Sequence, residues 1–95
     1  MKFVINKLKY DTNNMDLISD KCEYSYADGL FGVAITYRGR NVKLWKSKKD
    51  NWLLTFDKKD LCTCSKALTT KEAQGLLLKY DVDAYEKIFG ELEEA

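Results

Sequence analysis

The spacing of apolar residues changes once along this 95-residue chain, after Leu68. Before Leu68, apolar residues recur at every second position in short runs, most regularly over residues 31–37, and this spacing is typical of β-strands. After Leu68, they lie three or four positions apart, at Ala73, Leu76, Leu77 and Tyr80. That spacing is typical of an amphipathic helix. Strands followed by helices predict an α+β domain.

Turn signals divide the first 66 residues into short segments. The expected strands cover residues 2–5, 8–12, 31–37, 42–46, 52–56 and 61–65, with a weaker one within residues 17–26. Turns are expected at residues 6–7, 13–14, 28–29, 39–41, 48–51 and 57–60, where Asn, Asp, Gly and Lys gather. Strands joined by such short connections favour an antiparallel β-meander.

Two short helices are expected in residues 69–90. Thr69 and Glu72 have the spacing of a capping box at the start of the first helix. Asp81 or Asp83 caps the second, and Gly90 suits its C-terminal end. The predicted fold is therefore an antiparallel β-meander covered on one face by two short C-terminal helices. Residues 1–95 form one domain: a β-sheet over 1–66, helices over 69–90 and an acidic tail at 91–95. The other sheet face is expected to stay at least partly open to solvent.

Composition narrows the classes of protein that remain. The chain has no histidine, so imidazole chemistry and histidine metal ligation are excluded. No apolar run approaches the length of a membrane span, and three cysteines, an odd number, suit a reducing compartment. We therefore expect a cytoplasmic protein that does not enter a membrane and needs no cofactor. A net charge of +1 argues against a dedicated polyanion binder but leaves room for a local basic surface.

Charge is unevenly distributed along the chain. Between Asp28 and Asp50 there is no acidic residue, whereas residues 81–94 are strongly acidic. The candidate partner-binding residues are the cations and rings of the segment 37–52: Tyr37, Arg38, Arg40, Lys43, Trp45, Lys46, Lys48 and Lys49. Three interpretations remain open, namely a solvated charged face, a protein-binding surface and a nucleic-acid-binding surface. Within this hairpin, Trp45 is the residue that we most expect to be exposed, because its period places it with Lys43 and opposite Leu44.

Other candidate motifs favour structural roles. Cys22, Cys62 and Cys64 lack a fourth ligand and the usual spacing of a zinc site, so they are expected to be small buried apolar residues. Asp81, Asp83 and Glu86 are interpreted as helix caps rather than as a catalytic pair. The two glycines within residues 28–32 indicate a turn and lack the lysine of a phosphate-binding loop.

Three segments together resemble a known group of proteins. They are KLKYDT at residues 7–12, LWKSKKDNWLL at residues 44–54, and the C-terminal pair LTTKEA and DAYEKIFGE at residues 68–73 and 83–91. The chain is similar to small uncharacterised accessory proteins of Firmicutes phages, plasmids and conjugative elements. It departs from them in its cysteines and at Asp50, where that group usually has glycine. The resemblance implies a mobile-element accessory protein but defines no functional residue.

These observations predict a non-enzymatic interaction module that binds a host protein or ribonucleoprotein. Proteins of such origin often block host defence, so the resemblance includes an inhibitor of a defence nuclease such as a CRISPR effector among the expected roles. Direct nucleic-acid binding by residues 37–52 is the alternative. A small toxin-type ribonuclease that uses Lys, Arg and Tyr is a third hypothesis, although no partner for a general base stands out. The sequence does not predict an oligomeric state.

Overall fold

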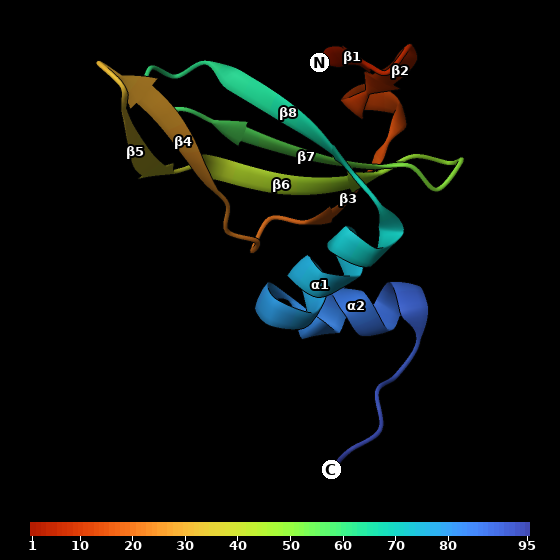
Figure 1. Cartoon of the computed structure of the whole chain (residues 1–95). Coiled ribbons are helices and arrows are strands. Elements are labelled where there is room, and N and C mark those ends of the chain that lie inside the picture. Colours follow the sequence, from red (N-terminus) through yellow and green to blue (C-terminus); the bar gives the residue numbers. More distant parts are fainter.

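A computed structural model describes residues 1–95, apart from the side chain of Leu30. The strands are β1 (Lys2–Ile5), β2 (Leu8–Asp11), β3 (Asp16–Ser19), β4 (Ser25–Leu30), β5 (Val33–Arg38), β6 (Arg40–Lys46), β7 (Trp52–Asp57) and β8 (Thr63–Leu68). A 3-10 turn, η1 (Thr12–Asn14), follows β2, and the helices α1 (Thr70–Tyr80) and α2 (Val82–Phe89) close the chain (Figure 1). The α+β class and the order of strands before helices are as predicted. Neither helix has the length and apolarity needed to cross a membrane.

A four-stranded antiparallel sheet in the order β3-β6-β7-β8 forms the centre of the molecule. Only β6, β7 and β8 form a simple meander, because β3 pairs with the outer edge of β6. The connection between β3 and β6 contains β4 and β5, which pair with each other as a separate two-stranded ribbon. We call this ribbon, residues 25–38, the arm (Figure 1).

The main core lies between the sheet and the helices. Leu44, Trp52 and Leu54 point to this side and are almost completely buried against Ala73 and Leu77 of α1. The rings of Trp52 and Phe89 stack with 5.9 Å between centroids, which joins α2 to the same core. Burying side chains of this size stabilises the fold by about 1.5–3 kcal/mol each.

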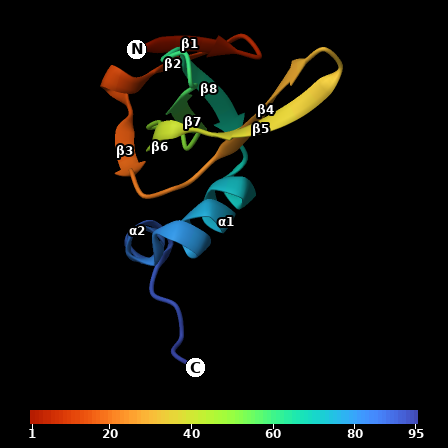
Figure 2. The ribbon, with the colours of Figure 1, turned by 90° about the vertical axis from the view of Figure 1, so that its left-hand side faces the viewer.

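The opposite face of the sheet is also partly covered. Figures 1 and 2 show the β1–β2 hairpin on the side of the sheet away from the helices. Tyr10 of this hairpin is buried, and Leu53 of β7 has no exposed surface, yet neither belongs to the helix-side core. This face is therefore only partly open, as expected: Leu53 is covered, whereas Leu17 and Lys43 remain exposed. Since β7 is covered on both faces, its residues Trp52–Phe56 are all buried.

Glycine positions explain how the arm leaves the sheet. Phe31 and Gly32, at φ 53° and 76°, form the tight turn between β4 and β5. The turn expected at residues 28–29 is therefore wrong, because Asp28 and Gly29 lie within β4. At the other end, Gly39 separates β5 from β6 and donates its N–H to Tyr24 O at 2.8 Å. The chain passes so close to Tyr24 and Phe56 there that a Cβ on Gly39 would lie 3.1–3.4 Å from them.

Candidate functional site

The structure divides the eight predicted contact residues between the two ends of β6. Tyr37, Arg38 and Arg40 lie at the base of the arm. The other end carries Lys46 and, in the β6–β7 turn, Lys48 and Lys49. Six residue steps along a strand separate these ends by about 20 Å. The predicted surface is therefore two separate groups rather than one continuous patch, with Lys43 and Trp45 between them.

Contacts within the protein hold the group at the base of the arm. Arg38 pairs with Glu23, and Arg40 Nη2 donates to Lys59 O at 3.0 Å. Tyr37 is half-buried, and its hydroxyl accepts a hydrogen bond from Lys59 Nζ at 3.1 Å. That hydrogen bond is the main reason that the pKa of Lys59 is raised. The guanidinium groups remain reachable, since the Arg38 side chain is 73% exposed.

Trp45 is not the exposed ring that the alternation predicted. It is half-buried on the hairpin side of the sheet, where it lies between Leu17 and Leu53 on the neighbouring strands. Its indole Nε1 donates to Thr55 Oγ1 at 2.9 Å. The alternation assigned the correct face to Trp45, but the β1–β2 hairpin covers part of that face. Trp45 is therefore mainly a packing residue.

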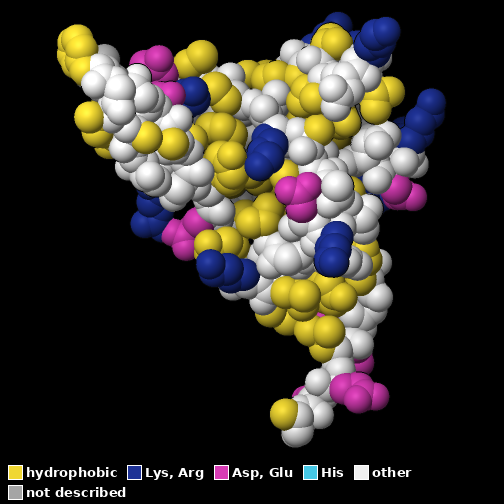
Figure 3. Space-filling model, in the orientation of Figure 1, with side chains coloured by type: hydrophobic (Ala, Val, Ile, Leu, Met, Phe, Trp, Pro, Cys, Tyr) yellow, Lys and Arg dark blue, Asp and Glu magenta, His cyan; other side chains and the backbone are white. Residues whose placement is uncertain are grey.

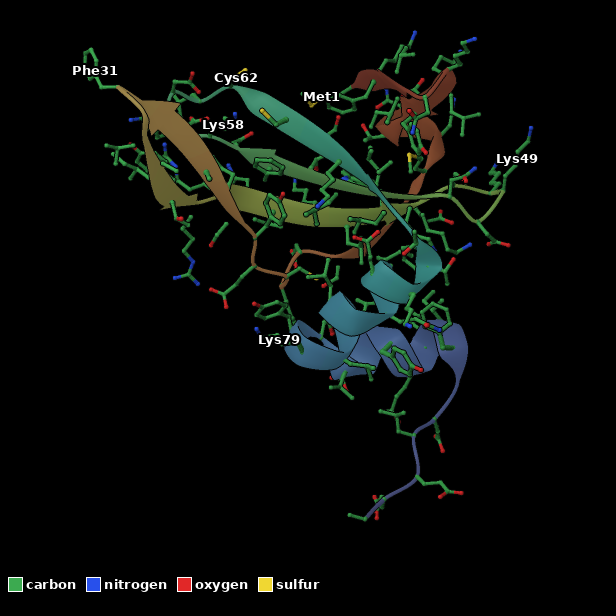
Figure 4. The ribbon with its side chains drawn as sticks, in the orientation of Figure 1. Met1, Phe31, Lys49, Lys58, Cys62 and Lys79 are labelled. Atoms are coloured by element: carbon green, nitrogen blue, oxygen red, sulfur yellow. The ribbon has the colours of Figure 1, made fainter. Side chains whose placement is uncertain are left out.

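The most exposed large apolar side chain among the described residues lies on the arm instead. Phe31 at the tip is 94% exposed, and Val33 and Ile35 behind it on β5 are 60% and 43% exposed. Figure 3 shows apolar atoms at this projecting corner, and Figure 4 shows Phe31 pointing away from the body of the protein. The alternation over residues 31–37 predicts a strand there, but it does not predict that these side chains are exposed. The available signal was Gly32, which permits a tight turn at the tip.

The base of the arm is firmly attached to the core. Tyr26 of β4 is buried and stacks on Tyr37 and Phe56, with centroid separations of 5.6 and 5.8 Å. Its hydroxyl accepts a hydrogen bond from Lys59 N at 2.8 Å. The ion pair between Lys58 Nζ and Asp28 Oδ1, at 3.5 Å, adds a second attachment partway along β4. The apolar tip is thus presented on a ribbon whose lower half is part of the fold.

The cysteines and carboxylates occupy separate places. Cys22 is buried in the helix-side core, and this burial raises the pKa of its thiol. Cys64 is half-buried, but Cys62 is exposed, so the expectation of three buried cysteines was wrong for Cys62. No group of three or more possible metal-ligating residues is found among the described side chains.

Asp81 acts as a helix cap, as predicted. Its Oδ1 accepts from Ala84 N at 3.2 Å at the start of α2, and its Oδ2 accepts from the Ser19 hydroxyl at 2.6 Å. The Ser19 hydrogen bond is the main reason that the pKa of Asp81 is lowered. Asp83 lies in the first turn of the same helix, where a carboxylate complements the helix dipole.

Comparison with protein-family models, curated proteins and solved structures yields no match to this chain. The resemblance to accessory proteins of mobile elements therefore stays a prediction.

Proposed function

We propose that this protein is a non-enzymatic interaction module that binds another protein through the arm. The observation that carries the proposal is the 94% exposure of Phe31, on a ribbon that also exposes Val33 and Ile35. Contiguous exposed apolar surface of this kind marks interaction sites in soluble proteins. Nothing in the packing of the fold requires a phenylalanine at the tip.

The surroundings of the tip suit a protein partner. Aromatic side chains are frequent centres of binding energy in protein interfaces, and arginine is enriched around them. Here Phe31 supplies the apolar anchor, while Arg38 and Arg40 at the base supply guanidinium groups for carboxylates on the partner. Burying a fully exposed Phe side chain contributes about 1.5–3 kcal/mol, which corresponds to about 10- to 150-fold in affinity.

The expected partner follows from the sequence resemblance. An accessory protein of a phage or conjugative element would bind a host protein or ribonucleoprotein, and a defence nuclease such as a CRISPR effector is one such target. The class of partner is inferred from the sequence resemblance, whereas the arm is chosen as the contact element because its apolar side chains are exposed. The two parts of the proposal can therefore be tested separately.

A capture experiment tests the arm. Tagged wild-type protein and the variant Phe31→Ser with Val33→Ser are used to capture partners from a Firmicutes lysate, with and without nuclease treatment. Val4→Ser is the matched control, because Val4 is 75% exposed on a different strand. We expect wild type and Val4→Ser to capture the same protein after nuclease treatment and the arm variant to lose it, with unchanged melting temperatures. Retention by the arm variant, or loss of all capture after nuclease treatment, would contradict the proposal.

A further inference from the structure

A second cationic site lies at the end of the molecule opposite the arm. Lys9 of β2 and Lys48 and Lys49 of the β6–β7 turn line a groove of about 380 Å³. The other lining residues are Leu8, Tyr10, Asn14, Ser47 and Asn51. Figure 4 shows Lys49 extending outward at this turn, and Figure 3 shows cationic side chains at the same end. Segments about 40 residues apart in the sequence thus bring three lysines together.

The acidic residues nearest to these lysines in the sequence are engaged elsewhere. Asp11 accepts hydrogen bonds from Asn13 N at 3.1 Å and from the Asn14 side-chain amide at 3.5 Å. Asp50 pairs with Lys46 at 2.9 Å on the helix side of the sheet. No acidic residue lines the groove, and none of the three lysines forms an ion pair with any described residue. The three lysines are therefore not paired within the described chain, and the Asp11 carboxylate, bound to the lining residue Asn14, remains as a negative charge beside the groove.

Neutral hydrogen-bond donors line the same groove. Ser47 Oγ accepts from Lys49 N and Asn51 N at 3.3 and 3.0 Å, and within the described chain no group accepts the hydrogen of its hydroxyl. The side-chain amide of Asn51 makes no hydrogen bond to a described residue. Ammonium, hydroxyl and amide donors without internal acceptors are the groups that bind phosphate oxygens. The only ring in the lining, Tyr10, is 7% exposed, so the groove offers no surface for stacking on bases.

We propose that this groove binds the phosphodiester backbone of nucleic acid, without reading base sequence. The site differs from the predicted basic segment 37–52, since it adds Lys9 from another strand and does not use the arginines or Trp45. The groove is also separate from the arm, so the proposal for one site can be refuted without refuting the proposal for the other. A ribonucleoprotein partner would be able to engage both.

The test measures binding of a fluorescein-labelled 20-base-pair DNA duplex by anisotropy between 20 and 200 mM salt. Three lysine–phosphate contacts predict a slope of log K against log salt of about −2.7, which is a loss of about 500-fold over this range. The triple variant Lys9→Gln, Lys48→Gln, Lys49→Gln should not bind. The control triple Lys21→Gln, Lys71→Gln, Lys87→Gln removes the same charge from exposed positions outside the groove and should bind as the wild type does.

Further measurements distinguish a phosphate-binding groove from a site for an acidic protein. The single variant Lys49→Gln should reduce the slope by about 0.9, as expected for one lost phosphate contact. The arm variant Phe31→Ser with Val33→Ser should retain wild-type affinity for the duplex. Equal affinity of the two triple variants would overturn the proposal. Binding of poly-glutamate but not of the duplex would assign the groove to an acidic protein and would overturn it as well.

Discussion

At the scale of single residues, Phe31 departs from two local preferences at once. Its backbone lies in the left-handed region at φ 53°, which glycine, asparagine and aspartate tolerate better than phenylalanine does. Its side chain is also almost fully exposed. A strained position that also leaves a large apolar side chain in water does not help folding, and such outliers concentrate at functional sites. Asp50, at φ 61°, likewise occupies a conformation that favours glycine.

Gly39 is the residue on which the attachment of the arm most depends. We expect Gly39→Ala to destabilise the protein by about 1–3 kcal/mol, because the new methyl group would crowd Tyr24 O and the Phe56 ring. Gly75→Ala is the control, since no atom lies within 4 Å of a Cβ there and alanine favours a helix by about 0.5–1 kcal/mol. Urea unfolding of both variants measures the difference. Equal stability of the two would show that the close approach at Gly39 is not a constraint.

At the scale of elements, one carboxylate joins three of them. Asp81 lies between α1 and α2, its backbone N–H donates to Leu77 O at the end of α1, and its side chain caps α2. Its bond to the buried Ser19 hydroxyl connects both helices to β3, the edge strand of the sheet. The position of the helices is thus tied to an edge strand of the sheet.

This arrangement predicts a specific pH dependence. The pKa of Asp81 is lower in the folded protein than in the unfolded chain, so the ionised form stabilises the fold at pH values above the unfolded value. That contribution is lost as the pH falls through the folded pKa. Asp81→Asn keeps a good helix cap but cannot ionise. We therefore expect its stability to lie below that of the wild type at pH 7, with the difference shrinking as the pH falls from 5 towards 2.

Thermal unfolding at several pH values measures this difference. Asp83→Asn is the control, because the Asp83 carboxylate accepts no hydrogen bond from a described residue. A difference between Asp81→Asn and wild type that stays constant with pH would refute a role for the Asp81 charge.

At the scale of the whole molecule, the protein has three layers: the β1–β2 hairpin, the four-stranded sheet and the helices (Figure 2). The middle strand β7 is buried on both sides, and the arm projects from one end of this body. The two proposed sites lie at opposite ends of the sheet, where the packed layers leave side chains uncovered. A partner large enough to span the body would be needed to contact both.

The three-layer arrangement predicts that the two faces of β7 matter equally. Leu53→Ala and Leu54→Ala should each destabilise the protein by about 2–5 kcal/mol, because both side chains have no exposed surface. Val4→Ala, on the solvent side of the hairpin, should be nearly neutral. Chemical denaturation measures all three variants. A loss below about 1 kcal/mol for Leu53→Ala would mean that the hairpin does not cover this face.

Local patterns were sufficient for much of the fold. The change of apolar spacing after Leu68, the capping box of Thr69 and Glu72, and the turns at residues 6–7 and 48–51 depend on contacts only a few residues apart. Such contacts can be read from the chain directly, and the structure confirms them. The grouping of Tyr37, Arg38 and Arg40 was also visible in the sequence, because these residues are neighbours along the chain.

Tertiary structure decided which of these side chains are available to a partner. The alternation of apolar and polar residues defines the two faces of a strand, but it does not indicate which segment covers either face. The β1–β2 hairpin lies on the side of the sheet away from the helices, although it is distant in the sequence from β6 and β7. Phe31 and Ile35 are exposed on the projecting arm. The sequence by itself therefore determined the fold class, the two helices and most of the strands, with strands before helices. Long-range packing alone decided that the arm is exposed and that Lys9 lines the same groove as Lys48 and Lys49. Both features depend on which segments lie side by side in space.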